Sequence, residues 1–293
     1  MAFKVITDGS CDLSDELVAK NDIEVVPFYV SMDEKTYLKE KKEIGVLDFY
    51  KQMVDNPNIF PKTSMPTVND FYEVFEKYAE AGMDMICICI TTKFSGSYNS
   101  ASSAKEDILK NYPNVKIEVI DATINTCIQG LLVLEVARMN KNGVSFEKAI
   151  KYTNIIKKTA RIFFTIGSMD YLRHGGRIGK LKGLIAATLK IKPLIVLKEG
   201  EIFSEGVAFT KNQSIVKVFK NCVKHFIENK IDYHDYNFII GTGINQEDYP
   251  ILKDKLHNAF PDADLPFGQI GATIGVHTGP YPIGVGIIKR YDV

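Results

Sequence analysis

The chain has 293 residues, of which 45% are hydrophobic and 25% charged, and its 36 basic and 36 acidic side chains give a formal net charge of zero. This apolar content excludes a disordered chain, and the lack of a basic surplus argues against a general nucleic-acid binder. No apolar run reaches the roughly 20 residues that a membrane span needs. We expect one large or two medium globular domains.

The N-terminal half alternates between strand-like and helix-like segments. Apolar runs typical of strands cover residues 5–7, 23–30, 85–91 and 115–120. Helical spacing covers residues 70–80, after a capping box at Thr67 and Asp70, and residues 97–111. Residues 124–139 are apolar nearly all round, which predicts a buried helix. This alternation predicts an α/β domain with a mainly parallel sheet.

The C-terminal half has a different pattern. Strand-like runs cover residues 161–166, 194–197, 202–210, 238–241 and 284–289, and helical patterns cover residues 146–158, 212–228 and 248–259. Glu199-Gly200-Glu201 indicates a hairpin between two of these strands. We therefore predict a second α/β domain with antiparallel strands, and place the domains at residues 1–160 and 161–293.

Three polar segments are candidates for chemistry, and we interpret them as loops: residues 62–67, 91–97 and 271–286. The second loop joins a buried strand to a helix start, where ligands bind in open α/β sheets and where free N–H groups favour anions. Ser95 precedes Gly96, which lets the backbone approach a ligand closely. Ser97 alone is better explained as a helix N-cap.

The third loop carries His277 between glycines, and a functional and a structural role for it have equal weight. The other four histidines lack metal-ligand spacing, and the five cysteines contain no CxxC pair. We therefore predict neither a metal site nor a disulfide framework. The cysteine pattern indicates a reducing, cytoplasmic compartment.

Residues 171–198 contain seven lysines and arginines and no acid. The ordinary meaning of such a run is a solvated face. The sharper hypothesis is a surface for phosphate, anionic lipid or an acidic partner. Apolar residues 184–197 share the region, so a transient contact of an amphipathic surface with a membrane is a further hypothesis.

Five segments in this order resemble the DegV family of bacterial fatty-acid-binding proteins, which includes the binding subunit of fatty acid kinase. They are residues 6–13 (ITDGSCDL), 62–66 (KTSMP), 94–97 (FSGS), 172–178 (LRHGGRI) and 277–280 (HTGP). The resemblance spans nearly the whole chain. Three positions depart from the family pattern: Gly9, Met65 and the segment at residues 121–130, where Cys127, Ile128 and Gln129 precede Gly130.

The resemblance implies a two-domain α/β protein that holds a long-chain fatty acid and is not an enzyme by itself. It implies that the carboxylate is bound by Thr63, Ser95 and His277, with Gly96, Ser97 and Thr278 as neighbours of the head group. It implies that Arg173 and Arg177 face the phosphate or the partner. The partner would be an ATP-dependent kinase subunit whose acyl-phosphate product enters phospholipid synthesis. No cofactor or metal is implied beside the bound acid.

Two other functions compete with this carrier. One is a stand-alone acyl hydrolase or acyltransferase, with Ser95 as nucleophile, His277 as base and Asp8 or Asp121 as the orienting acid. Against it, Ser95 lies in Lys-Phe-Ser-Gly and not in the G-x-S-x-G nucleophile elbow. The other is a regulator or nucleic-acid module that uses the basic run, although no recognition motif accompanies it.

Overall fold

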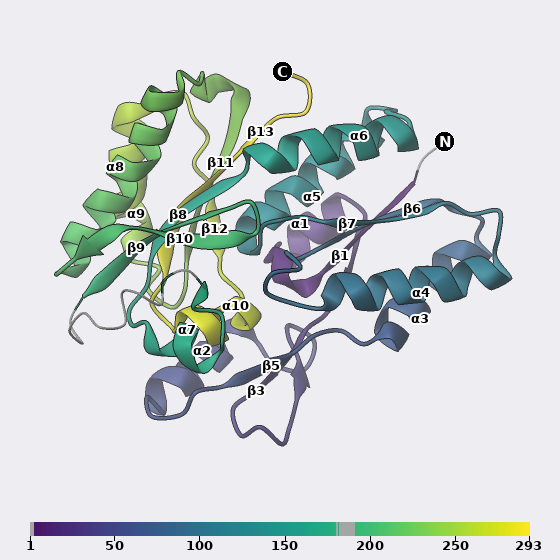
Figure 1. The fold of residues 1–293 in the computed structure, drawn as a ribbon, viewed down its shortest axis with the longest axis horizontal. Helices are drawn as coiled ribbons and strands as arrows, with labels where there is room; N and C mark the ends of the chain where they lie inside the picture. Colours follow the sequence, from purple (N-terminus) through teal and green to yellow (C-terminus); the bar gives the residue numbers. More distant parts are fainter. Residues whose placement is uncertain (1–2, 180, 182–190) are drawn as a thin grey trace.

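The computed structural model describes residues 3–179, 181 and 191–293, and the strands in these ranges form three sheets (Figure 1). The first sheet is parallel throughout, in the order β2-β1-β6-β7, as the strand–helix alternation predicts. Its strands are β1 (Lys4–Asp8), β2 (Ile23–Val26), β6 (Met85–Cys89) and β7 (Ile117–Asp121). All five residues of β6 are buried, because helices cover the sheet on both faces.

The second sheet has the order β10-β9-β8-β13-β11-β12, and all its neighbours are antiparallel except β11 and β12. The predicted hairpin is confirmed as β9 (Lys192–Lys198) and β10 (Glu201–Ala208). The other strands are β8 (Arg161–Thr165), β11 (Tyr236–Thr242), β12 (Phe267–Gln269) and β13 (Ile283–Lys289). The predicted fold class is therefore confirmed, with a parallel four-stranded sheet before residue 160 and a mostly antiparallel six-stranded sheet after it. The division into domains 1–160 and 161–293 stays a prediction.

A small third sheet, in the order β4-β3-β5, was not predicted. It consists of β3 (Tyr29–Ser31), β4 (Leu38–Lys39) and β5 (Lys62–Ser64). The apolar run at residues 23–30 therefore contains two strands of different sheets, which Pro27 separates because it has no N–H to donate. Pairing in this sheet sets Thr63 opposite Val30.

Helices surround and separate the two large sheets (Figure 1). Those of the N-terminal part are α1 (Asp15–Lys20), α2 (Val46–Asp55), α3 (Val68–Glu80), α4 (Ser97–Asn111), α5 (Thr126–Lys141) and α6 (Phe146–Ile156). Those of the C-terminal part are α7 (Asp170–His174), α8 (Lys211–Asn229), α9 (Asp248–Ala259) and α10 (Ala272–Thr278), and short 3-10 turns are η1 (Gly9–Cys11), η2 (Lys157–Thr159) and η4 (Tyr233–Asp235). None of the described helices combines the length and the apolar character of a membrane span.

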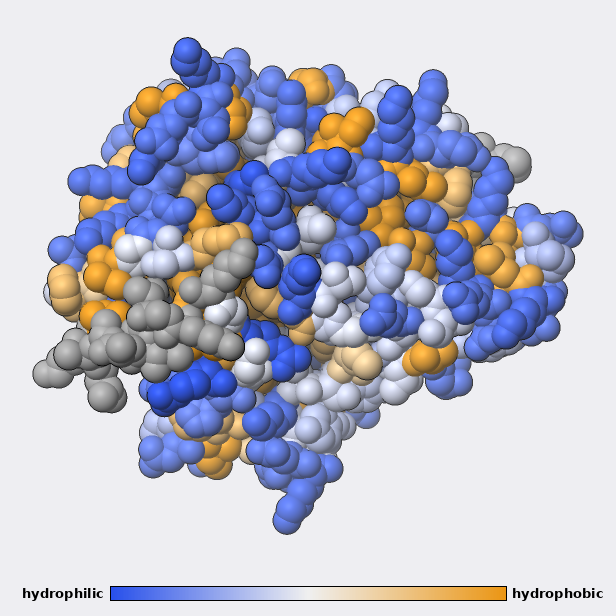
Figure 2. Space-filling view, in the orientation of Figure 1, coloured by the Kyte–Doolittle hydropathy of each residue, from blue (hydrophilic) through white to orange (hydrophobic). Residues whose placement is uncertain are grey.

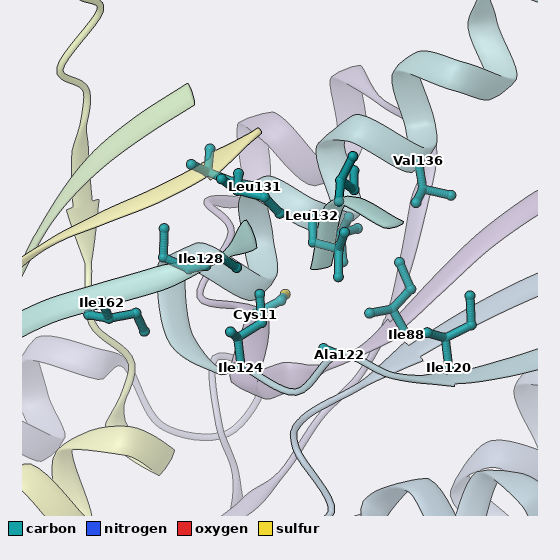
Figure 3. Close-up of a cluster of buried hydrophobic side chains, with 14 of the residues drawn as sticks. Cys11, Ile88, Ile120, Ala122, Ile124, Ile128, Leu131, Leu132, Val136 and Ile162 are labelled. Atoms are coloured by element: carbon teal, nitrogen blue, oxygen red, sulfur yellow. The ribbon is translucent and has the colours of Figure 1, made fainter. Parts of the chain in front are cut away.

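Helix α5 packs between the two large sheets. It contacts β1 and η1 on one side and β11 and β13 on the other. Figure 3 shows Ile128 and Leu131 of α5 among the side chains that join the two halves. This position explains why the helix is apolar nearly all round, and its predicted burial is confirmed.

The prediction of a loop over residues 271–286 is wrong at both ends, because residues 272–278 form α10, which carries His277, and residues 283–286 belong to β13. The loop predicted over residues 62–67 is likewise wrong at residues 62–64, which form β5. The local sequence of α10 is a poor helix former, with Gly275 and several β-branched residues. Contacts with residues far away in the sequence stabilise this helix. Glu40 accepts hydrogen bonds from the N–H groups of Ala272 and Thr273, and the ring of Tyr50 packs against Gly275.

Candidate ligand-binding site

A cavity of about 320 Å³ lies inside the molecule, where α5, α10 and the six-stranded sheet meet the end of β6. Its volume is at the lower end of the range of small-molecule pockets. The wall is mostly apolar, and its apolar side chains include Phe28, Ile90, Phe94, Ile128, Ile162, Phe164, Leu172, Leu197, Ile202, Ile239, Ile270 and Ile274. The cavity therefore suits a ligand with a long hydrocarbon part.

The outer surface differs from this interior. Figure 2 shows one face covered mainly by hydrophilic side chains, with apolar ones in small separate groups. Two of the most exposed apolar side chains, Phe209 and Ile227, lie outside the cavity wall. The internal cavity is thus the better candidate for burying a hydrocarbon chain.

Three polar side chains of the cavity wall come from three separate segments of the chain: Thr63 from β5, Ser95 from the loop before α4, and His277 from α10. The Oγ1 atom of Thr63 is 3.2 Å from Nε2 of His277. The Ser95 hydroxyl accepts a hydrogen bond from the N–H of Ser97 and itself donates to no residue in the described part of the chain. The fold thus brings the three residues predicted to bind a carboxylate to one cavity.

His277 is neutral at physiological pH. Burial, together with the positive charges of Arg177 and Lys62, lowers the pKa of its imidazole to about 3. Its Nδ1 atom has no hydrogen-bond partner within the described part of the chain. We therefore place the single proton of the neutral ring on Nε2, because this atom faces Thr63 and the cavity, where a hydrogen-bond acceptor is present. The same positive charges favour an anionic ligand beside the ring.

Gly175 makes room for the imidazole. A Cβ atom at this position would overlap Nδ1 of His277 and lie 3.0 Å from its Cε1. The basic run at residues 171–198 predicted a charged surface and not this contact. The signal was present as the Gly-Gly pair, but only the folded chain identifies its neighbour.

Arg177 points inward. Its Nε and Nη2 atoms donate to the carbonyl oxygen of Phe94 at 3.2 and 3.1 Å, and its Nη1 atom donates to the carbonyl of Gly175. It also lines the cavity, and burial lowers the pKa of its guanidinium. Arg177 therefore links two segments by hydrogen bonds: the loop that carries Phe94 and Ser95, and the segment around Gly175 that packs against His277.

Arg173 is about half exposed and pairs with Asp170 one helical turn away, at 2.7 Å. It does not belong to the cavity wall as the described residues define it. Much of the predicted basic run, Lys180 and residues 182–190, lies outside the described residues. Contact of this run with a phosphate, a partner or a membrane stays a prediction.

The predicted neighbours of the head group divide into two sets. Gly96 and Thr278 line the cavity, and Met65 covers Gly96, whose absent Cβ would lie 2.8 Å from the Met65 sulfur. Thr278 directs its hydroxyl to the carbonyls of Ile274 and Gly279, each at 3.2 Å. Ser97 lies behind the cavity wall, with no exposed surface.

Ser97 is not the N-cap of α4, because Gly96 holds that position. The Ser97 hydroxyl instead donates to Oδ2 of Asp8 at 2.7 Å. This carboxylate also accepts from the Ile90 N–H, the Ser10 hydroxyl and the Gln129 amide. Burial raises the pKa of Asp8, and these four donors oppose that rise.

Neither candidate acid orients His277. Asp8 is held by the four donors above, and Asp121 accepts from the hydroxyl of Thr92 and the N–H of Thr123. A Ser–His–Asp arrangement is therefore absent from the described residues. They also contain no group of three or more His, Cys, Asp or Glu side chains placed to hold a metal ion.

The chain matches the family profile described as "Uncharacterised protein, DegV family" over residues 2–290. A DegV domain-containing protein of Clostridium perfringens is 31% identical over 99% of this chain and 100% of its own length. Another, from Clostridium acetobutylicum, is 32% identical over 98% of this chain and 99% of its own.

Solved structures are similar over the same extent. The crystal structure of a stearic-acid-binding protein from Eubacterium ventriosum has 39% identity and a TM-score of 0.95, with 99% of each chain covered. A DegV family protein from Thermus thermophilus, described for its fatty acid binding, has 23% identity and a TM-score of 0.88 over 99% of this chain and 100% of its own. The second likeness shows the fold alone.

Proposed function

The chain belongs to the DegV family, and from this premise we propose that it binds a long-chain fatty acid, with the hydrocarbon in the cavity and the carboxylate at Thr63, Ser95 and His277. The observation that carries the proposal is the combination of one apolar cavity with one cluster of polar side chains in its wall. The stearic-acid-binding relative from Eubacterium ventriosum supports this choice of ligand.

The two parts of the site have separate tasks. At about 0.8 kcal/mol per buried CH₂, roughly fifteen methylenes contribute about 12 kcal/mol before the costs of association are subtracted. These costs return several kcal/mol. A buried carboxylate is unfavourable unless it is hydrogen-bonded, so the hydroxyls and the imidazole fix the head group and its orientation.

Neutral His277 can bind the carboxylate as a hydrogen-bond donor through Nε2, without forming an ion pair. Arg177 and Lys62 supply the positive potential that favours the ionised acid. The N-terminus of α4, which begins beside Ser95, adds the positive end of the helix dipole. Together these groups recognise an anion without a metal ion.

The first test is the lipid content of the purified protein. An organic-solvent extract analysed by mass spectrometry should be enriched in long-chain fatty acid, and the emptied protein should bind added oleate or palmitate. The His277→Ala variant should retain at least about tenfold less acid, the loss of one hydrogen bond to a charged group, while its circular dichroism is unchanged. No enriched acid and no binding of added acid would contradict the proposal.

The finer part of the proposal is that the bound carboxylate is presented to an ATP-dependent kinase subunit in the cytoplasm. The acyl phosphate formed there would enter phospholipid synthesis. The half-exposed guanidinium of Arg173 supports a role toward the partner, since Asp170 holds it outside the cavity. The Arg173→Ala variant should therefore lose acyl-phosphate formation while it retains lipid. Loss of lipid in proportion to activity would assign Arg173 to the binding site instead.

A stand-alone hydrolase is not favoured. The imidazole of His277 has no acid at Nδ1 within the described residues, and its Nε2 faces Thr63. A general base in such enzymes is oriented by a third group. Hydrolysis of a p-nitrophenyl ester that disappears in Ser95→Ala would reverse this conclusion.

A further inference from the structure

A second cavity, of about 910 Å³, lies on the other side of the N-terminal end of α5. Its lining includes apolar side chains of α1 and α5, namely Leu17, Leu131 and Leu134, and charged side chains such as Lys41 and Asp262. Only Cys127 and Ile239 line both cavities, as far as the described residues go. These two side chains form the partition between them.

Two glycines show how Cys127 fills the wall. Gly241 of β11 lines the first cavity, Gly268 of β12 lines the second, and the two are paired in the sheet. The Cys127 sulfur would lie 3.6 Å from a Cβ at Gly241 and 2.6 Å from one at Gly268. The thiol therefore occupies the space that both glycines leave open.

Ile239 completes the partition. Its Cδ1 would lie 3.1 Å from a Cβ at Gly268, and its Cγ2 would lie 3.4 Å from one at Gly286. Gly286 faces Ile239 across the β11–β13 pair and lines the first cavity. Figure 3 shows the neighbouring α5 side chains Ile128 and Leu131, of which the first lines one cavity and the second lines the other.

The partition lies away from the polar cluster. Ile270 packs 3.2 Å from the Cβ position of Gly241, beside Cys127, and precedes α10, whose far end carries His277. A chain whose carboxylate is held at His277 and that extends along α10 meets the partition with its hydrocarbon part.

We propose that Cys127 and Ile239 limit the length of the acyl chain by closing the first cavity against the second. This inference rests on the proposed fatty-acid binding and adds the residues that set specificity within it. Interiors are close-packed, so methylenes beyond the partition displace side chains or stay unburied. Removing the partition joins the two cavities and lets longer chains reach the apolar side chains of Leu131 and Leu134.

The test is competition between chain lengths. Delipidated protein is incubated with an equimolar series of saturated acids from myristic to behenic acid, and the bound acids are quantified by mass spectrometry. Ile239→Ala should shift the bound distribution toward longer acids, by about fourfold for each further methylene admitted, the factor that corresponds to burying one CH₂. Cys127→Ala is the milder variant and should shift it in the same direction.

Leu131→Ala is the matched control, because it enlarges only the second cavity and leaves the partition in place. It should bind the same distribution as the native chain. An unchanged distribution in Ile239→Ala and Cys127→Ala, or an equal shift in Leu131→Ala, would overturn the inference while fatty-acid binding stands. Failure of the native chain to bind any acid of the series would instead refute the proposed function.

The position of the tail gives a second measurement. In a crystal structure of Ile239→Ala with behenate, the end of the chain should lie beside Leu131 and Leu134. A tail confined to the first cavity would overturn the inference.

Discussion

Two buried polar clusters lie side by side at the ends of β1 and β6, and they use their hydrogen-bonding groups differently. Around Asp8, four donors converge on one carboxylate. Around His277, neither Nδ1 nor the proton of the Ser95 hydroxyl has a partner among the described residues. One cluster already contains the carboxyl group that its donors bind, whereas the other is arranged to receive one.

This difference separates stability from function. Buried polar groups are normally paired, because an unpaired group costs free energy. A complete network such as that of Asp8 should matter to folding, and an incomplete one should matter to ligand binding. Substitutions in the two clusters therefore test whether the division is real.

The largest effect is expected from Asp8→Ala, which leaves the buried Ile90 N–H and Ser97 hydroxyl without their acceptor. The Ser10 hydroxyl can still donate to Gln129. Each unsatisfied group costs about 1–3 kcal/mol, so the free energy of unfolding should fall by about 3 kcal/mol or more in urea denaturation. Asp121→Ala is the matched control, an acid at the end of another parallel strand that is only partly buried. A smaller loss for Asp8 than for Asp121 would contradict the division.

A third buried cluster extends the comparison to pH. Asp12 accepts from the Thr126 hydroxyl at 2.6 Å and lies near Glu40, which accepts from Thr273. Burial and the negative charge of Glu40 raise the pKa of Asp12 to about 8, and burial raises the pKa of Glu40. Like charges that share a site cannot both ionise easily, so this pair holds a proton at neutral pH.

The sign of the effect follows from the raised pKa. An unfolded Asp loses its proton near pH 4, whereas folded Asp12 keeps it until about pH 8. The contribution of this group to stability is therefore complete at low pH and is lost as the pH rises to about 8. The Asp12→Asn side chain cannot ionise, so the variant should lose this dependence of the free energy of unfolding on pH. The slope that is lost is at most about 1.4 kcal/mol per pH unit. Urea denaturation from pH 5 to pH 8 measures the slope in the native chain and in Asp12→Asn. Equal slopes would contradict a proton shared by Asp12 and Glu40.

The sequence predicted what depends on local pattern. The apolar run of β6, the buried helix α5 and the hairpin of β9 and β10 follow from periodicity and turn residues. The resemblance of five short segments also selected Thr63, Ser95 and His277, which the fold brings to one cavity.

What the sequence did not predict depends on contacts between distant residues. Helix α10 forms because Glu40 and Tyr50 dock it, more than two hundred positions away. Gly175 makes room for His277, and Cys127 separates two cavities, through neighbours that no local pattern identifies. Ser97 has the residue type of an N-cap, but Asp8 recruits its hydroxyl.

The smallest and most direct test compares two serines of one loop. Ser97 donates to Asp8 and has no exposed surface, whereas Ser95 lines the cavity two positions earlier. Ser97→Ala should lower the free energy of unfolding by about 1–2 kcal/mol and leave fatty-acid affinity nearly unchanged. Ser95→Ala should do the opposite, with stability within about 0.5 kcal/mol of native and an affinity about tenfold lower. Urea denaturation and oleate titration of both variants measure these two quantities. If Ser97→Ala lost affinity and Ser95→Ala lost stability, the network around Asp8, and not the cluster around His277, would bind the ligand.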